Sequence, residues 1–253
     1  MKRVAIIAAM AGELKPLVKG WEQEFRSGVR LWRKPNDEGE WVAACAGAGA
    51  EAATRALAEV EKDGTISEVF SVGWAGALRD EIQPGKAYWV SGVIDARTGE
   101  NFESGEIESH TGRKSKDAAR VGHPNFRLVT SPVVASAEEK RRLAVSYQAS
   151  MVDMEAAAVA RLAQMRGIPF CCVKGISDGY RDQLPDFTSF ISTQGQFSMA
   201  RFVLFALLHP QYWLALRRMG ENSRKAARQI NDLLLDFFDE RGRIRERNGY
   251  PHN

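Results

Sequence analysis

The chain has 253 residues and a mass of 28.1 kDa, with 44% hydrophobic and 26% charged residues and a net charge of +3 at pH 7. This composition is ordinary for a soluble globular protein. The small charge, spread along the chain until the C-terminal region, argues against a nucleic-acid-binding protein. No uncharged apolar run reaches the roughly 20 residues that a membrane-spanning helix needs.

The three cysteines, Cys45, Cys171 and Cys172, do not suggest a disulfide framework. Their number is odd, and adjacent residues of a strand point to opposite faces. The first residues lead directly into an apolar strand, with no cleavage site of a signal peptide. We therefore expect a protein of the reducing cytoplasm.

In chain order, apolar runs predict strands at 4–9, 40–45, 68–72, 86–94, 126–130 and from Phe170 onward. Helices are predicted at 12–19, 51–62, 137–145, from Glu155 onward and over most of 186–240, with a break at His209-Pro210. The polar stretch 97–125 reads as a long loop or short hairpin, and the charged tail 241–253 as frayed. Alternating strands and helices predict an α/β fold with a mixed, largely parallel twisted sheet covered on both faces.

The glycine-rich turn at 47–52, GAGAEA, formally matches the dinucleotide-binding fingerprint, with alanine in its third position. Glu68 lies near the place where a ribose-binding acid would be expected. The usual fingerprint follows the first strand of its unit, whereas here the first strand leads to Gly12 and Glu13. We therefore favour a tight strand-to-helix turn over a nicotinamide site, and we expect no redox cofactor.

Two carboxylates are the first candidates for chemistry. Glu155 opens a helix of small residues, and Asp178 ends the apolar strand that begins at Phe170. Strand ends that face a helix start are where open α/β sheets place ligands. Two carboxylates in one crevice suit acid-assisted cleavage of a glycosidic-type bond. For either residue alone, a surface helix start or a Ser-Asp turn is the competing interpretation.

Four motifs occur in order: VAIIAAMAGEL at 4–14, SVGWAGAL at 71–78, VDMEAAA at 152–158 and VKGISD at 173–178. They resemble the purine nucleoside phosphorylase and nucleosidase superfamily, and the methylthioadenosine/adenosylhomocysteine nucleosidase branch is the closest mechanistic model. The resemblance covers roughly residues 1–207. It implies a three-layer α/β/α sandwich of the nucleoside phosphorylase type, in one domain, with residues 208–253 as a helical extension packed on it.

The resemblance also implies roles for single residues. Asp178 would protonate or hydrogen-bond N7 of a purine, and Glu13 would activate the attacking water. Glu155 would hold the ribose hydroxyls, with Met154 packed on the sugar. The remaining substrate-binding candidates are Trp74, Ala75, Gly76, Val133, Lys174 and Ser177. Such a transition state resembles an oxocarbenium ion, so an acid at the base and carboxylates near the sugar both stabilise it.

Three of these positions depart from the nucleosidase pattern. Trp74 stands where the nucleosidase loop usually carries a small hydroxyl residue, and Lys174 replaces an arginine. Val133 lies near a position that is aromatic in many members. Glu13 would repel phosphate, and no arginine flanks 73–77, so we favour hydrolysis over phosphorolysis. A non-catalytic nucleoside-binding protein on this fold is a further alternative, against which Glu13, Glu155 and Asp178 together argue.

A second, narrower resemblance concerns the segments 95–100, 132–140 and 209–227, which are similar to those of hopanoid-associated members of the superfamily. It implies an adenosine whose 5′ substituent is a bulky apolar group of the adenosylhopane type. Methylthioadenosine or adenosylhomocysteine is the other possible substrate type. For both substrate types we predict that the enzyme releases adenine. Its partner is then a small-molecule nucleoside and not a nucleic acid.

The C-terminal helical region joins an apolar segment, from Phe202 to Leu216, to the cations Arg217, Arg218, Arg224, Lys225 and Arg228. Such a segment, 202–228, can contact an anionic bilayer surface. The competing interpretation is that the helices pack on the sheet or on a dimer partner. The resemblance implies a homodimer. The histidines His110, His123, His209 and His252 are scattered, so we expect no metal site.

Overall fold

The computed structural model describes residues 2–36, 39–105, 125–182, 184–185, 187–190, 192 and 197–247. Its strands are β1 (Lys2–Ala8), β2 (Glu22–Arg26), β3 (Val29–Asn36), β4 (Gly39–Cys45), β5 (Ile66–Ala77), β6 (Ala87–Val90), β7 (Gly92–Asp95), β8 (Asn101–Glu103), β9 (Arg127–Thr130), β10 (Met151–Asp153) and β11 (Phe170–Asp178). Its α-helices are α1 (Ala11–Leu14), α2 (Ala50–Glu61), α3 (Ala137–Tyr147), α4 (Ala156–Arg166), α5 (Met199–Leu208) and α6 (Trp213–Arg247), with 3₁₀ turns η2 (Phe187–Phe190) and η3 (Pro210–Tyr212).

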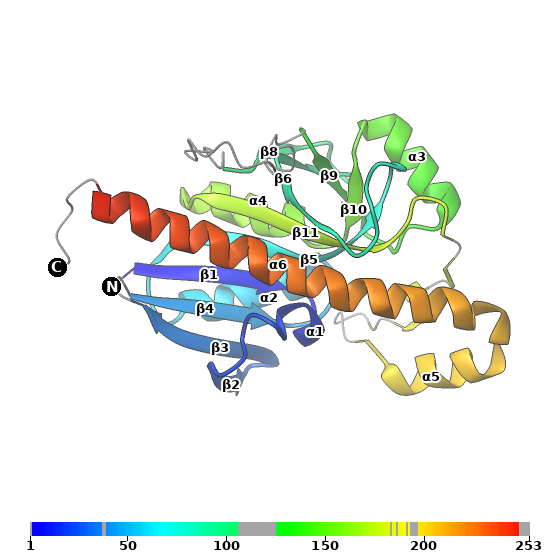
Figure 1. The fold of residues 1–253 in the computed structure, drawn as a ribbon, viewed down its shortest axis with the longest axis horizontal. Helices are drawn as coiled ribbons and strands as arrows, with labels where there is room; N and C mark the ends of the chain where they lie inside the picture. Colours follow the sequence, from blue (N-terminus) through cyan, green and yellow to red (C-terminus); the bar gives the residue numbers. More distant parts are fainter. Residues whose placement is uncertain are drawn as a thin grey trace.

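One mixed sheet runs through the described residues, in the order β2-β3-β4-β1-β5-β10-β9-β7-β8, with β11 between β5 and β6 (Figure 1). β4, β1, β5 and β11 are parallel to one another, so their carboxyl ends meet at one edge of the sheet. β10 is antiparallel to β5, and β6 is antiparallel to β11. The predicted α/β class, with a largely parallel central sheet, is confirmed.

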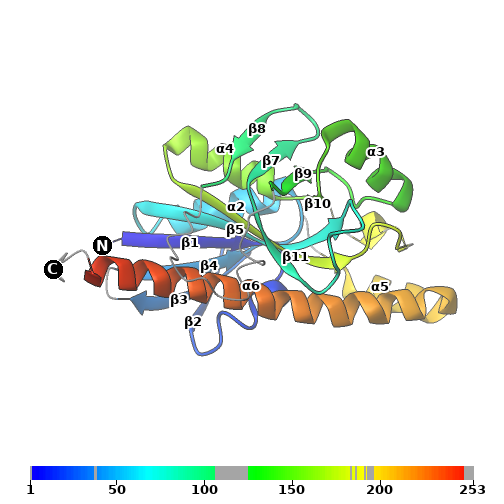
Figure 2. The same ribbon diagram turned by 45° about the horizontal axis from the view of Figure 1, so that its top comes forward.

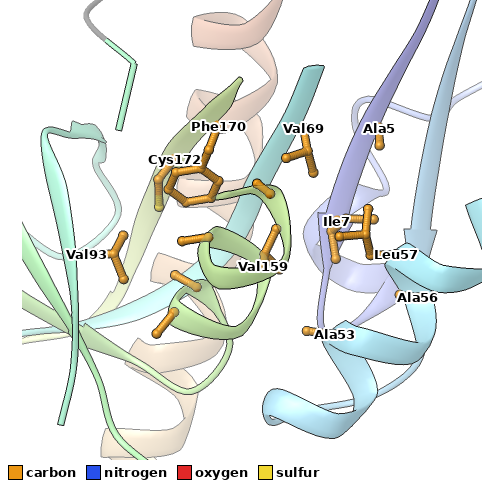
Figure 3. Packing of buried hydrophobic residues seen from close by; sticks show 14 of the residues in the cluster. Ala5, Ile7, Ala53, Ala56, Leu57, Val69, Val93, Val159, Phe170 and Cys172 are labelled. Atoms are coloured by element: carbon orange, nitrogen blue, oxygen red, sulfur yellow. The ribbon is translucent and has the colours of Figure 1, made fainter. Parts of the chain in front are cut away.

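Helices cover both faces of this sheet. On one face α2 and α4 pack against β1, β5 and β11, where small and branched side chains such as Ala53, Leu57 and Val159 interlock with Ile7 and Val69 (Figure 3). All nine residues of β11 are buried, which explains why the strand begins with an apolar run, 170–173. The result is a three-layer arrangement whose central strands are largely buried.

The long helix α6 covers the opposite face, where it packs on β11, β5 and β6 (Figure 2). Ile230, Leu234 and Phe237 are its buried contacts with the sheet. The approach is close at Gly175 of β11, where an added Cβ would lie 2.8 Å from the Ala226 Cβ. The first part of α6 lies beyond the sheet, on the side of the strand carboxyl ends, and α5 lies beside it (Figures 1 and 2).

Most predicted elements are confirmed, and three are corrected. The helix predicted at 12–19 ends at Leu14, because Pro16 has no N–H to donate and its ring clashes with the preceding turn. The strand predicted at 68–72 extends to Ala77, through the glycine-rich segment. The strand predicted at 86–94 is divided at Ser91, whose N–H donates to the Phe126 carbonyl as the chain changes partner from β11 to β9.

The hairpin of β2 and β3 was not predicted. The polar stretch 97–125 begins with β8, which forms a short hairpin with β7, while 106–124 lies outside the described residues. The tail predicted to be frayed, 241–253, is corrected in its first part, because α6 continues to Arg247, while 248–253 also lie outside the described residues. The three cysteines are buried and outside any disulfide. Within the described part of the chain, no helix is long and apolar enough to cross a bilayer.

Candidate active site

The candidate residues gather where the parallel strands end. Glu13 follows β1, Trp74 lies in the second half of β5, and Asp178 is the last residue of β11. Glu155 is the N-cap of α4, directly after β10. Segments far apart in the chain thus deliver three carboxylates to one edge of the sheet, as a ligand crevice at strand ends requires.

Backbone N–H groups hold the Glu13 carboxylate in place. Its Oε2 accepts from the N–H of Ala9 at 2.9 Å and of Met10 at 2.7 Å, and its Oε1 accepts from the Trp74 N–H at 2.8 Å. The side chain is buried. Gly73 permits this approach, since an added Cβ there would lie 2.8 Å from Glu13 Oε1. The carboxylate is therefore fixed in position at the end of β1.

Glu155 reaches the start of a second helix. Its Oε1 accepts a hydrogen bond of 2.6 Å from the N–H of Gly49, the N-cap of α2. Its Oε2 accepts a longer bond of 3.3 Å from the Met154 N–H. The positive end of the α2 dipole favours a negative charge at this place. The GAGAEA turn thus binds a carboxylate of the protein itself, in line with its interpretation as a strand-to-helix turn.

A fully buried ion pair lies beneath these two carboxylates. Lys174 Nζ is 2.9 Å from Asp153 Oδ2 and 3.3 Å from the Ser71 hydroxyl. Asp153 also accepts from the Thr130 hydroxyl at 2.7 Å and from the Ala156 N–H at 2.9 Å, which caps α4. With all these partners, the pair fixes the start of α4 and hence the position of Glu155.

Burial dominates the electrostatics of the two glutamates. Desolvation raises the pKa of Glu13 above its ordinary value, although the backbone N–H donors and Lys174 act against it. Desolvation and the nearby Asp153 carboxylate raise the pKa of Glu155 to about 8, again opposed by Lys174. Lys174 is thus the nearby cation that favours the ionised form of both carboxylates.

We expect replacement of Lys174 to shift the pH dependence of activity. If Glu13 is the catalytic base and Glu155 binds the sugar, both carboxylates must be ionised, so kcat/KM falls as either takes up a proton on the acid side. In Lys174→Met both pKa values rise further, and the acid limb of kcat/KM moves to higher pH by about one unit. Lys174→Arg keeps the charge and should leave the limb near that of the parent protein. An unmoved limb in a folded Lys174→Met protein would contradict this assignment.

Asp178 is held by two side chains. Its Oδ1 accepts from the Ser177 hydroxyl at 2.5 Å, and its Oδ2 forms an ion pair with the Nζ of Lys140. Lys140 lies in the first half of α3, is 2% exposed, and donates a second hydrogen bond of 2.7 Å to the Gly179 carbonyl. A buried ammonium and a hydroxyl therefore orient the carboxylate that ends β11.

Gly76 leaves room for this ion pair. It pairs with Asp178 of β11 on one side and with Val152 of β10 on the other, so β5 lies between both strands at this point. A Cβ at Gly76 would lie 3.1 Å from Asp178 Oδ2 and 3.1 Å from Lys140 Cε. The carbonyl oxygen of the neighbouring Ala75 lies 3.3 Å from the Ser177 hydroxyl oxygen. Ala75 and Gly76 thus support the Asp178 region through their backbone and small size.

The side chains of Trp74 and Val133 lie in different parts of the structure. The backbone N–H of Trp74 contacts Glu13, but its indole Nε1 donates to the Ser223 carbonyl of α6 at 3.0 Å. The indole therefore connects β5 to α6. Val133 lies on the loop between β9 and α3, is 43% exposed, and its backbone exchanges hydrogen bonds with the Ser131 hydroxyl. Met154 is half-buried beside Glu155.

Sequence reasoning missed three residues of this cluster: Lys140, Asp153 and Gly49. Asp153 carried a signal, because an Asp three residues before a helical N–H is a common cap. Lys140 carried none, since it lies in a helix with several other charged residues. Among the described residues no group of His, Cys, Asp and Glu has the arrangement of a metal site. His110, His123 and His252 lie outside those residues.

The model of the phosphorylase superfamily matches residues 3–132 and 128–207, which include every candidate residue above. The chain belongs to the phosphorylase superfamily. No curated protein matches it in sequence. The match ends at residue 207, one residue before the end of α5, so α6 lies beyond the part that the family model describes.

Solved structures share this superfamily fold along nearly the whole chain. The 5′-methylthioadenosine/S-adenosylhomocysteine nucleosidase from Helicobacter pylori, solved with butyl-thio-DADMe-Immucillin-A, is 19% identical, with a TM-score of 0.67 over 95% of this chain and 99% of that one. Futalosine hydrolase of Helicobacter pylori is 18% identical, with a TM-score of 0.67 over 94% and 98%. The Neisseria meningitidis nucleosidase, in complex with methylthio-immucillin-A, is 19% identical, with a TM-score of 0.67 over 95% and 100%.

Proposed function

We propose that this superfamily member hydrolyses the N-glycosidic bond of a purine nucleoside and releases adenine from a 5′-substituted adenosine. One observation carries the proposal: the sheet edge brings together a buried, backbone-held Glu13, a Glu155 that accepts from the N–H of Gly49, and an Asp178 paired with a buried lysine. These are the three kinds of group that glycosidic cleavage uses, for the water, the sugar and the base.

The reaction breaks the C1′–N9 bond, and its electron pair passes to the purine. The Asp178 and Lys140 pair delivers a proton toward N7, so the base leaves as a neutral molecule. The sugar carbon takes on positive charge, which the carboxylates of Glu155 and Glu13 stabilise electrostatically. Water then adds to C1′, and Glu13 accepts the proton that the water loses. Products are the free purine and the free 5′-substituted sugar.

The hydrogen bonds of Glu13 favour water over phosphate as the nucleophile. The N–H groups of Ala9, Met10 and Trp74 are donors of the kind that bind phosphate at strand ends, and all three donate to the Glu13 carboxylate. A phosphate dianion at this place would have to displace a buried carboxylate or lie against its negative charge. Both outcomes cost more than binding a neutral water.

Product analysis tests the choice of nucleophile. With a 5′-thioadenosine in phosphate buffer, we expect adenine and a free reducing sugar, at a rate independent of phosphate concentration. The matched control uses a buffer without phosphate. A sugar 1-phosphate as the main product would make the protein a phosphorylase, and binding without turnover would make it a nucleoside-binding protein.

The 5′ substituent, the assembly and the location belong to the same proposal. The resemblances support a thioether, as in methylthioadenosine or adenosylhomocysteine, or an apolar adenosylhopane-type group. We further propose a cytoplasmic homodimer, with residues 1–207 as the nucleosidase domain and 208–253 as its helical extension. Adenine release from a panel of 5′-substituted adenosines, together with light scattering for the mass in solution, tests these statements.

A further inference from the structure

The α5–α6 hairpin, residues 199–222, exposes a cluster of large apolar side chains. Among the described residues, six of the eleven exposed large hydrophobic residues belong to it. They are Val203 (46% exposed), Leu204 (60%), Leu207 (65%), Leu208 (69%), Trp213 (54%) and Leu214 (59%). Contiguous exposed apolar side chains of this size mark an interaction surface.

The two faces of α5 differ in their packing. Phe202 and Phe205 contact Phe190 of η2, with ring centroids 5.7 Å and 5.2 Å apart. The outward positions 203, 204, 207 and 208 follow the i, i+1, i+4, i+5 spacing of one helical face. Since the inner face already has its partners, the outer face is not a misplaced core surface. Its side chains are available to an external partner.

The hairpin is a built structure that holds this face outward. The Trp213 indole donates to the Ala206 carbonyl of α5 at 2.6 Å, and the ring of His209 stacks on Phe205 with centroids 4.0 Å apart. Both ribbon views show α5 and the first part of α6 extending past the sheet, away from the C-terminus (Figures 1 and 2). The apolar cluster is therefore displayed at one end of the molecule.

Cations border the apolar cluster. Residues 201–228 contain one acid, Glu221, and six exposed cations: Arg201, Arg217, Arg218, Arg224, Lys225 and Arg228. Arg217 lies 3.0 Å from Glu221, which leaves a large excess of positive charge on this stretch. The whole chain carries only +3, so the remainder of the molecule is slightly acidic. The excess charge is thus concentrated beside the exposed leucines.

We infer that the α5–α6 hairpin docks on the surface of an anionic lipid bilayer. Apolar side chains and an interfacial tryptophan beside arginines are the features of a helix that lies in the headgroup region. The ten residues of α5 are too few to span a bilayer. A second copy fits less well, because a two-fold contact would place the same cation-rich patch against itself.

Docking would bring the candidate active site close to the lipid. The Trp74 indole, next to Glu13, donates a hydrogen bond to the Ser223 carbonyl of α6. Trp213, in the apolar cluster, precedes Ser223 by ten residues. At the helical rise this is about 15 Å along α6. The strand ends that carry the site therefore lie on the same side as the docking face. An apolar 5′ substituent in the membrane would be within reach, a consequence that rests on the proposed function.

Vesicle co-sedimentation tests docking without any assay of activity. The probes are vesicles of phosphatidylcholine alone and of phosphatidylcholine mixed with phosphatidylglycerol. We expect binding to the mixed vesicles that weakens as salt is added, since the charge term is screened. Leu204→Gln with Leu207→Gln should lower this binding about tenfold or more, and so should Arg217→Glu with Arg218→Glu.

Matched controls separate docking from general surface effects and from catalysis. Val145→Gln with Met165→Gln removes side chains that are 80% and 77% exposed on α3 and α4, and should leave binding unchanged. The hairpin variants should retain parent activity on a water-soluble nucleoside, and Asp178→Asn should retain vesicle binding. The inference would be overturned if the parent protein and the hairpin variants bound vesicles equally, or if the parent did not bind them at low salt. It would also be overturned if the Leu204→Gln, Leu207→Gln protein had half the parent mass in solution, because the hairpin would then be an interface between two copies of the chain.

Discussion

Asp178→Asn should lower kcat for a 5′-substituted adenosine by about 10²-fold or more, the usual loss when a general acid is removed. The asparagine amide cannot pass a proton to N7, so the purine must leave as an anion. The side chain has nearly the same size and can still accept from Ser177. We therefore expect KM to change much less than kcat. Steady-state kinetics with adenine release as the readout measures both.

A substrate whose leaving group needs no proton provides the control. With 4-nitrophenyl riboside, whose phenolate leaves readily, Asp178→Asn should keep a rate near that of the parent protein. Lys140→Met should show the same selective loss on the purine substrate, because Asp178 would lose its buried partner. If Asp178→Asn slows both substrates equally, the residue does not act on the base.

The two variants also separate stability from catalysis. Asp178→Asn leaves the Lys140 ammonium buried without its counter-charge, which is a large destabilising effect. The double variant Asp178→Asn, Lys140→Met removes both charges, so its thermal stability should recover relative to either single variant. Its activity on the purine nucleoside should not recover. A double variant that regained turnover would show that the single losses came from misfolding.

Glu13→Gln is expected to lower kcat by about 10²- to 10³-fold, as loss of a general base does. The amide cannot take a proton from water. In addition, one of its two polar atoms would be an NH₂ group facing either the Trp74 N–H or the pair from Ala9 and Met10. The attacking water would thus lose both its base and the fixed oxygen that positions it.

The expected pattern for Glu13→Gln is the opposite of that for Asp178→Asn. Water must attack C1′ whichever base leaves, so Glu13→Gln should slow adenine release and 4-nitrophenyl riboside cleavage alike. Circular dichroism and calorimetric binding of a nucleoside analogue report whether the fold and pocket persist. Parent-like turnover of both substrates by a folded Glu13→Gln protein would remove Glu13 from the mechanism.

Local patterns in the sequence were sufficient for most of the framework. β11 is buried along its whole length, and its apolar run with a terminal Ser-Asp marked both a strand and a candidate acid. Glu155 was recognisable because it precedes a run of small helix-forming residues. The β2 strand was not predictable, since its residues are almost all exposed and form a strand only by pairing with β3. An edge strand of this kind has no apolar periodicity.

The roles of the site residues depended on contacts between distant parts of the chain. Glu155 meets Gly49 across 106 residues, and Asp178 meets Lys140 across 38. A local pattern reports which face of an element is apolar, but it holds no information on which residue of another element lies opposite. The strand order, set by packing of the whole sheet, brought these pairs together. The carboxylates could thus be read from the sequence, whereas their buried partners were decided only by the tertiary structure.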